Sequence, residues 1–141
     1  MRTIAFPGRF SSLEAIRNFY ARAAEQAGLD EDSIADVELA VDEAASNIID
    51  HAYGGEGKGE IECSYRVIPD GLEVILHDHG KPFDPEAVGE PDLVSDVCCR
   101  ESGGLGMHFM KSLMNSVKFS FNGHGGNLLT MTKLQKKALK P

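Results

Sequence analysis

Three polar side chains recur at four-residue spacing within the Ala- and Ile-rich run from Glu38 to Gly54: they are Glu43, Asn47 and His51. On a helix, residues four positions apart lie on one face, so the three would form a stripe beside the apolar positions. Carboxylate and amide oxygens are the ligands that hard cations such as Mg²⁺ take. No basic residue occurs from Ile34 to Tyr53. The stripe is therefore a candidate cation site, and an acidic, solvated helix face is the alternative.

A second candidate follows an apolar run, in the stretch HDHGKPFDP from His77 to Pro85. Asp78 is only a hydrogen-bond acceptor when ionised, so it can take a hydrogen bond from an exocyclic amine such as that of adenine. Gly80 has no side chain and allows a flat ligand to approach the backbone closely. The alternative is an Asp-x-Gly turn that binds nothing.

The third candidate is a glycine-rich segment, SGGLGMHFMKSLM, from Ser102 to Met114. Gly103, Gly104 and Gly106 directly precede an amphipathic pattern, where free backbone N–H groups and a helix dipole favour an anion such as phosphate. The segment lacks the GK[ST] of a P-loop and the context of a dinucleotide fingerprint. A hinge for the preceding loop is the alternative.

Other chemistry is less favoured by the sequence. No GxSxG motif occurs, which argues against an ordinary hydrolase. The three cysteines lack CxxC spacing, so we expect reduced thiols rather than a disulfide framework or a zinc site. We also expect no zinc site at the histidines, because ligand-type spacing is missing among His77, His79, His108 and His124.

The elements that would hold these residues are predicted by hydrophobic periodicity and turn residues. The coarse order is β, α, α, β, β, loop, α, β, β, with the long loop read as a lid or binding loop. Because the strands come in hairpins, an α+β fold is predicted, with a mixed, mostly antiparallel sheet covered on one face by helices. The predicted strands are Thr3–Phe6, Ile61–Ile68, Leu72–His77, Val117–Phe121 and Leu128–Leu134, and the predicted helices are 11–27, 30–53 and 105–115, with a possible short helix at Asp84–Val88.

Bulk properties narrow the class of protein. The chain has 141 residues, 42% of them hydrophobic, and a net charge of −8 with a pI near 5.0. We expect one domain over residues 1–141 and no direct nucleic-acid binding, because an acidic protein repels phosphates. No apolar run is long enough to span a membrane and no signal peptide is recognised, so a cytoplasmic protein is expected. The lysine-rich end, residues 135–141, is predicted to be a solvated tail.

Taken together, the three segments resemble the signature motifs of the GHKL ATPase superfamily, the Bergerat-fold group of gyrase, Hsp90, histidine kinases and MutL. Within this group the chain most resembles the small stand-alone anti-sigma-factor serine kinases of bacteria. Glu43 to His51 matches the ExxxNxxxH helix, Asp78 to Pro85 matches the DxGxPFDP loop, and Gly103 to Met107 matches the GGLGL/M loop. The match extends from about Thr3 to Lys133.

The resemblance implies a role for each matched residue. Asn47 would hold a Mg²⁺ ion that bridges the phosphates of ATP, and Glu43 would be the general base toward a serine hydroxyl. Asp78 would bind the adenine amine, with Gly80 beneath the ring. Residues 81–103 would form the ATP lid. The loop that would offer its backbone to the phosphates comprises Gly103, Gly104, Leu105, Gly106 and Met107.

Two positions depart from the family pattern. The family commonly has Gly-Thr near the last strand, whereas this chain has Gly126 and Asn127, so an amide would replace the threonine hydroxyl at the adenine site. Some members carry an arginine immediately before the glycine loop. This chain has Ser102 there, with Arg100 two residues upstream.

The resemblance implies an ATP- and Mg²⁺-dependent protein serine kinase that acts as an anti-sigma factor. Its expected partners are a sigma factor and an anti-sigma factor antagonist, whose serine it phosphorylates, and the family suggests a homodimer. The alternative is a non-catalytic, nucleotide-sensing module that binds a partner without phosphoryl transfer. A sensor histidine kinase domain is disfavoured, because no dimerisation helices with a phosphoacceptor histidine precede the domain.

Overall fold

The computed structural model describes residues 2–81, 109–122 and 126–136. Most of the expected lid, the possible helix at Asp84–Val88 and the glycine loop lie outside these residues. A short helix at 109–113 agrees with the later part of the helix predicted at 105–115. The other elements are β1 (Arg2–Pro7), the 3₁₀ turn η1 (Phe10–Ser12), α1 (Leu13–Gln26), α2 (Glu31–Asn47), the π-helical turn η2 (Ile48–Ala52), β2 (Glu60–Ile68), β3 (Gly71–Asp78), β4 (Ser116–Asn122) and β5 (Gly126–Leu134).

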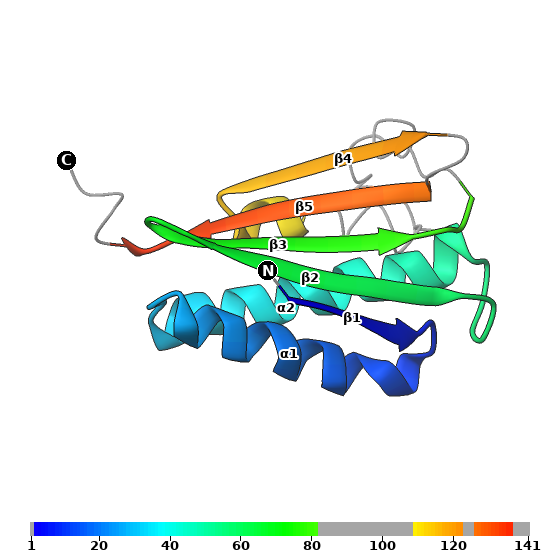
Figure 1. Cartoon of the computed structure of the whole chain (residues 1–141), viewed down its shortest axis with the longest axis horizontal. Coiled ribbons are helices and arrows are strands. Elements are labelled where there is room, and N and C mark those ends of the chain that lie inside the picture. Colours follow the sequence, from blue (N-terminus) through cyan, green and yellow to red (C-terminus); the bar gives the residue numbers. More distant parts are fainter. Residues whose placement is uncertain (1, 82–108, 123–125, 137–141) are drawn as a thin grey trace, which may run out of the picture.

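The strands form one sheet in the order β1-β2-β3-β5-β4, and every pairing between described strands is antiparallel. Helices α1 and α2 lie along one face of this sheet (Figure 1). The predicted α+β class, with a mostly antiparallel sheet covered by helices on one face, is therefore confirmed. Both predicted hairpins, β2–β3 and β4–β5, are present.

Alternating burial along the strands explains the two layers. In β3, Leu72, Val74 and Leu76 are fully buried, whereas His77 and Ile75 are only partly buried. Successive side chains of a strand point to opposite faces, so the first set packs against the helices and the second lies on the other face. Burying each such side chain contributes roughly 1.5–3 kcal/mol to folding.

The end of α1 and the start of α2 lie where the sequence predicts them. The Asp30 carboxylate accepts a 2.8 Å hydrogen bond from the Ser33 backbone N–H and caps the start of α2. Gly28, with φ of 78°, directly follows the end of α1. Helix α1 is joined to the sheet by the Tyr20 hydroxyl, which donates a 2.6 Å hydrogen bond to the carbonyl of Ile75.

The predicted second helix is not α-helical throughout. Regular α-helix ends at Asn47, and the following turn η2 is a π-helix in which the Tyr53 N–H donates to the carbonyl of Ile48, five residues earlier, at 2.9 Å. The carbonyl of Ala52 instead accepts a 2.7 Å hydrogen bond from the N–H of Lys81. Tertiary hydrogen bonding thus accompanies a local widening of the helix, and π-turns of this kind are frequent at functional sites.

Cys63 is a free thiol buried in the core, as expected for a reduced protein. Burial raises the pKa of the Cys63 thiol to about 12. Cys98 and Cys99 lie outside the described residues. The thiol of Cys63 is therefore protonated and packs as a small apolar group.

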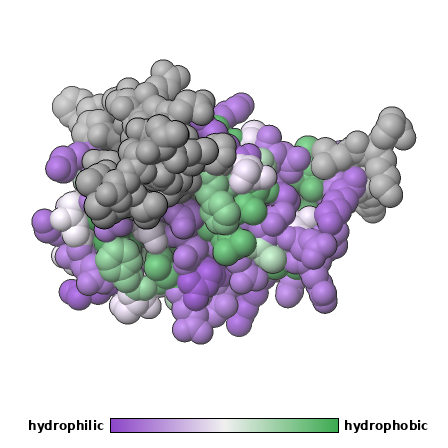
Figure 2. Space-filling model, turned by 180° about the vertical axis from the view of Figure 1, so that it is seen from behind, coloured by the Kyte–Doolittle hydropathy of each residue, from purple (hydrophilic) through white to green (hydrophobic). Residues whose placement is uncertain are grey.

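The surface seen in Figure 2 is mainly hydrophilic, with hydrophobic residues gathered in limited patches. Within the described parts of the chain, no helix is both long and apolar enough to cross a membrane.

Candidate functional site

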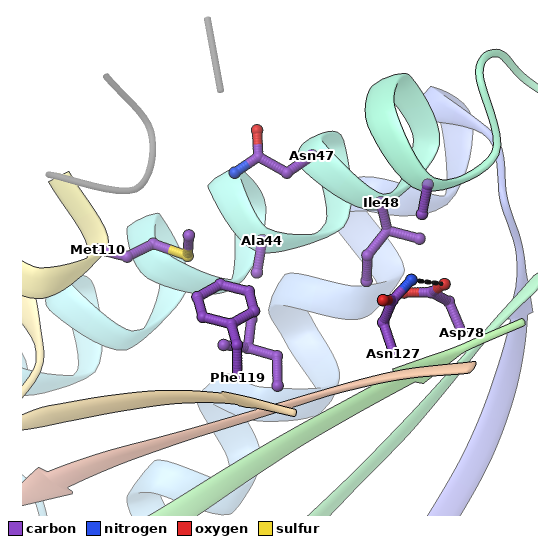
Figure 3. Close-up of a pocket in the computed structure, with 9 residues that line it drawn as sticks. Ala44, Asn47, Ile48, Asp78, Met110, Phe119 and Asn127 are labelled. Carbon is purple, nitrogen blue, oxygen red and sulfur yellow. Dashed lines mark hydrogen bonds between the residues drawn. The ribbon is translucent and has the colours of Figure 1, made fainter. Parts of the chain in front are cut away.

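A pocket lies between helix α2 with its π-turn η2 on one side and the sheet on the other (Figure 3). Two of the predicted site residues, Asn47 and Asp78, line it together although 31 positions separate them in the chain. Asn127, the residue that replaces the family's threonine, lines it as well. The full lining consists of Ala44, Asn47, Ile48, Ala52, Asp78, Met110, Phe119, Asn127 and Leu129.

Asp78 is the buried carboxylate of the pocket. It is the last residue of β3 and its exposed fraction is 2%. Its Oδ1 accepts hydrogen bonds from the Gly80 N–H and from the Asn127 side-chain amide, each at 2.8 Å. Burial raises the pKa of Asp78 above its ordinary value, and these two hydrogen bonds partly oppose that rise. Both hydrogen bonds use Oδ1, so Oδ2 is the oxygen that could accept a hydrogen bond from a donor in the pocket.

Gly80 occupies a place where a side chain does not fit. A Cβ atom on Gly80 would lie 2.4 Å from the carbonyl oxygen of Ala52, which is rigid backbone of η2. The adjacent Lys81 N–H donates to that same carbonyl. The turn after β3 is thereby held directly against the end of the long helix, which brings the first two sequence motifs together.

Asn127 connects Asp78 to the beginning of the expected lid. Its Nδ2 donates to Asp78 Oδ1 at 2.8 Å and to the carbonyl of Lys81 at 2.7 Å. Gly126 has φ of 82°, and a Cβ atom there would lie 1.9 Å from the carbonyl oxygen of Asp78. The Asn127 amide thus contacts both Asp78 and Lys81, while its expected role at an adenine site stays a prediction.

Asn47 lies on the helix side of the pocket, apart from the pair formed by Asp78 and Asn127 (Figure 3). Its side chain is 8% exposed, and its buried Nδ2 has no hydrogen-bond partner among the described residues. Leaving a buried amide group unpaired costs roughly 1–3 kcal/mol. A bound group with a hydrogen-bond acceptor could satisfy this Nδ2 donor. If the amide is flipped, its oxygen takes the same place and could instead bind a donor or a cation.

Glu43 lies one turn before Asn47 on α2 and is partly buried, but it does not line the pocket. Burial raises the pKa of Glu43, and the neighbouring negative charge of Asp42 raises it further. Asp42 itself forms a 2.6 Å ion pair with Arg17 of α1. A carboxylate whose pKa is raised toward neutral pH is better suited to general-base catalysis than an ordinary one.

The structure thus joins part of the predicted site. Asn47, Asp78 and Asn127 line one pocket, Gly80 donates a hydrogen bond to Asp78, and Glu43 lies one turn before Asn47 on α2 without lining the pocket. His51, the last residue of the helix motif, lies in η2, where the wider turn breaks the strict four-residue stripe. The predicted phosphate loop lies outside the described residues: Gly103, Gly104, Leu105, Gly106 and Met107.

The apolar walls of the pocket were not singled out by sequence reasoning. Phe119 and Leu129 come from β4 and β5, and Met110 comes from the helix at 109–113. Met110 carries a weak signal, since its helical periodicity predicts a core position, and it is fully buried. Alternation along the two C-terminal strands could have placed Phe119 and Leu129 on the helix-facing side.

Two of the histidines lie close together, although the sequence predicts no zinc site among them. His77 and His79 were predicted to lack ligand-type spacing, yet two residues along an extended chain return to the same side. Both imidazoles approach the carboxylate of Glu62, at 2.6 Å for His77 and 3.8 Å for His79. The sequence spacing could not predict that Glu62, on the neighbouring strand, lies beside His77.

A known family of ATPase domains matches most of this chain. The model of a family described as the histidine kinase-like ATPase domain matches residues 6–133 of the chain.

Similar curated proteins are named serine-protein kinase RsbW. The protein from Listeria monocytogenes EGD-e is 33% identical over 135 residues, covering 93% of this chain and 85% of the relative. The Bacillus velezensis protein is 36% identical over 122 residues, covering 84% of this chain and 75% of the relative. The Bacillus subtilis protein is 34% identical with the same coverage.

Solved structures show the same fold at lower identity. The RsbU and RsbW domains of a Mycobacterium tuberculosis protein match with a TM-score of 0.63 and 18% identity, over 95% of this chain and 32% of that one. The histidine kinase domain of a blue-light activated kinase from Erythrobacter litoralis matches with a TM-score of 0.53 and 18% identity, over 75% and 46% of the two chains.

Proposed function

The chain belongs to the histidine kinase-like ATPase family, and from that premise we propose that it is an ATP-dependent protein serine kinase that acts as an anti-sigma factor. Several relatives that match most of its length are named serine-protein kinases. Its substrate is a serine of an anti-sigma factor antagonist, and its other partner is a sigma factor. The family resemblance further suggests that it works as a homodimer.

The observation that carries the proposal is the buried carboxylate of Asp78 in a pocket with apolar walls. Burying a carboxylate to 2% exposure costs free energy, even with hydrogen bonds from Gly80 and Asn127. Such a costly group at this position favours a role in binding a ligand. An adenine base supplies what this site lacks, namely an amine donor for the carboxylate and a flat apolar surface for the walls.

The triphosphate would extend from the base toward Asn47. The amide oxygen of Asn47 is a suitable ligand for Mg²⁺, and its unpaired buried Nδ2 is consistent with an amide that a bound group completes. When bound, Mg²⁺ neutralises negative charge on the phosphates. Backbone N–H groups of Gly103, Gly104, Leu105, Gly106 and Met107 are assigned to the phosphates from the sequence motif alone.

Glu43 is the residue to which we assign the general base. Its carboxylate takes the proton of the substrate serine hydroxyl, whose oxygen bonds to the γ-phosphorus of ATP. The bond from that phosphorus to the β,γ-bridging oxygen breaks, and ADP leaves with the electron pair. The raised pKa of Glu43, caused by burial and then by Asp42, fits a group that must accept a proton.

The proposal is tested by incubating the protein with γ-labelled ATP, Mg²⁺ and purified candidate antagonist proteins. Label on an antagonist serine is the expected result. Nucleotide binding without label on any candidate would favour the non-catalytic module, and label on a histidine of the chain itself would favour a sensor-kinase chemistry. Absence of nucleotide binding would contradict the proposal altogether.

Two substitutions separate binding from transfer. We expect Asn47→Ala to lose Mg²⁺-dependent ATP binding while the fold persists, and Glu43→Ala to bind ATP but to lose phosphoryl transfer. Titration calorimetry with and without Mg²⁺ measures the first effect, and serine labelling measures the second. Ser46→Ala, which changes the residue next to Asn47 on the same helix, is the matched control and should behave as wild type. Equal ATP affinity in wild type and Asn47→Ala would refute the metal assignment.

A further inference from the structure

Three potential metal ligands meet on the sheet near the end of β3, outside the nucleotide pocket. They are Glu62, His77 and His79, and one ligand atom from each lies within 4.8 Å of the other two. His77 Nδ1 is 2.6 Å from Glu62 Oε2, and His79 Nε2 is 3.8 Å from Glu62 Oε1. The two imidazole rings are in edge contact, with centroids 4.7 Å apart.

The backbone fixes this meeting. Glu62 of β2 and His77 of β3 are directly paired in the antiparallel register, so their side chains emerge side by side. His79 follows two residues later on the same side. The backbone N–H of His79 donates a 3.0 Å hydrogen bond to the hydroxyl of Tyr53, which itself donates to the carbonyl of Glu60 at 2.5 Å. The position of His79 is therefore fixed by a hydrogen bond of its backbone and not by one of its side chain.

The three side chains are on the face of the sheet opposite the helices and are open to solvent. Their exposed fractions are 42% for Glu62, 28% for His77 and 58% for His79. A cation can approach the group from water without opening the core.

We propose that Glu62, His77 and His79 form a binding site for Zn²⁺ or a similar borderline transition-metal ion, with Nδ1 of His77, Nε2 of His79 and one Glu62 oxygen as ligands. Two imidazoles and one carboxylate are a ligand set of zinc sites that keep a fourth position open. Ligands at zinc distances of 2.0–2.2 Å in a tetrahedron lie roughly 3.4 Å apart. The observed separations, from 2.6 Å to at most 4.8 Å, bracket that value.

The site is chemically distinct from the one assigned to Mg²⁺. Mg²⁺ prefers oxygen ligands in an octahedral arrangement, whereas imidazole nitrogen favours zinc, copper, nickel and related ions. Asp78 lies between the two histidines in sequence, but it points to the opposite, buried face of the sheet. The proposal therefore stands independently of the kinase assignment. A bound ion would join β2 to β3 and to the residue that follows β3.

Titration calorimetry of the untagged, nucleotide-free chain with Zn²⁺ tests the site, with Co²⁺ as a spectroscopic probe of the ligands. We expect one ion per chain at this site, a higher melting temperature with Zn²⁺, and no displacement by millimolar Mg²⁺. His79→Gln is the least disruptive ligand variant, because His79 is exposed and lies beyond the last residue of β3. Removing one ligand should weaken affinity by more than the roughly 10–100-fold that loss of an outer-shell partner causes.

Glu62→Gln and Glu73→Gln form a matched pair of variants. Glu73 is also a glutamate on the same sheet face, where it pairs with Arg66 of β2. Glu62→Gln should lose the high-affinity Zn²⁺ and the visible Co²⁺ spectrum, while Glu73→Gln should keep both. Wild type that binds no Zn²⁺ would overturn the proposal. Zn²⁺ affinity that survives both Glu62→Gln and His79→Gln would also overturn it, because the ion would then be held elsewhere, for example by thiols.

Discussion

At the scale of single residues, the pKa of Glu43 depends on its burial and on the charge of a neighbouring residue. Burial is the larger cause of its raised pKa, and the Asp42 carboxylate is the second. Asp42 does not act as a free charge, because it is paired with Arg17 at 2.6 Å. Removing its charge leaves the burial of Glu43 in place and takes away one repulsive neighbour.

We therefore predict that Asp42→Asn shifts the acidic limb of the pH–rate profile toward lower pH. Glu43 must be deprotonated to accept a proton, so its activity rises as the pH rises through its pKa. A lower pKa moves that rise to a more acidic range. The measurement is kcat/KM for serine phosphorylation against pH, with Asp50→Asn, an exposed residue of η2, as control. A limb that stays in place or moves to higher pH would contradict Glu43 as the base.

Burial of the Asp78 carboxylate makes the stability of the fold depend on pH. Its pKa in the folded protein is raised, chiefly by burial, above the value of 3.8 expected when unfolded. Between these two pKa values the folded state binds more protons than the unfolded state. Stability from this residue therefore falls as the pH rises through that window, and the cost is fully present above the folded-state pKa.

Asp78→Asn should accordingly leave the melting temperature at pH 7 unchanged or higher while it weakens ATP binding. The variant removes the buried charge, but its amide offers donors where the adenine amine requires an acceptor. Loss of a hydrogen bond to a charged group, worth about 1.5–3 kcal/mol, corresponds to roughly 10- to 100-fold in affinity. Calorimetric ATP binding and thermal unfolding measure the two effects. A marked drop in melting temperature with unchanged ATP affinity would show that Asp78 is structural.

Residue types and spacing predicted Glu43, Asn47, Asp78 and Gly80 as candidates without any structure. They could not predict the contact of Asn127 with both Asp78 and Lys81, which depends on how two strands and a loop meet. They also missed Glu62 beside His77, because a cross-strand pair leaves no mark on the spacing within either strand.

At the scale of elements, the site depends on the contact between the π-turn η2 and the turn after β3. The carbonyl of Ala52 accepts the Lys81 N–H and lies where a Cβ of Gly80 would be. The turn at Gly80 can therefore pack this closely against η2 only if residue 80 has no side chain.

Gly80→Ala should lower both stability and ATP affinity. The added methyl would meet backbone 2.4 Å away, and overpacking of this kind costs about 1–3 kcal/mol. Gly54→Ala is the matched control: it has open space around it but φ of 72°, so it should destabilise through backbone strain alone and leave ATP affinity unchanged. Urea unfolding and ATP titration distinguish the two. Gly80→Ala with wild-type ATP affinity would refute the coupling.

Helix and strand positions were predicted well because capping residues and periodicity are local signals. Asp30, Gly28 and the turn at Pro69 to Gly71 act within a few residues of themselves. The π-turn at Ile48–Ala52 was missed because its apolar pattern is also compatible with an α-helix. Its hydrogen bond to Lys81 involves a residue nearly 30 positions away.

At the scale of the whole molecule, Lys133 ties three segments together. Its Nζ donates to the carboxylate of Asp36 in α2 at 2.9 Å and to the carbonyl of Leu113 at 2.5 Å. Its side chain is only 14% exposed, whereas Lys136, three residues later, is 57% exposed beside Asp32. A buried charged hydrogen bond contributes to stability, but an exposed pair contributes little.

Lys133→Met, which keeps the apolar stem, should destabilise the protein by about 1–3 kcal/mol, because it leaves the Leu113 carbonyl and Asp36 without their donor. Lys136→Met should leave the urea midpoint unchanged. Equilibrium unfolding in urea at low and high salt measures both variants. High salt should not destabilise the wild-type protein as Lys133→Met does, because salt screens a partly buried ion pair only weakly. Equal midpoints for the two variants would contradict this role of Lys133.

The sheet order could be predicted only in part. The hairpins β2–β3 and β4–β5 follow from turn residues between apolar runs, but the pairing of β3 with β5 joins Gly71 to Leu134 across more than 60 residues. Such distant pairing is decided by which apolar faces complete the core, and no local pattern reports it. The antiparallel sheet and the single helical layer nevertheless followed from the number and grouping of strands.

Cys63 is a natural probe for the opening of the core. Its thiol is fully buried against Tyr20 and, with a pKa of about 12, is almost entirely protonated at neutral pH. A thiol reacts with an alkylating or disulfide reagent only as the thiolate, and only when the reagent can reach it. In a chain whose Cys98 and Cys99 are serine, the rate of labelling would therefore count the openings of the core, and slower labelling on addition of ATP would report how strongly the ligand holds the layers together.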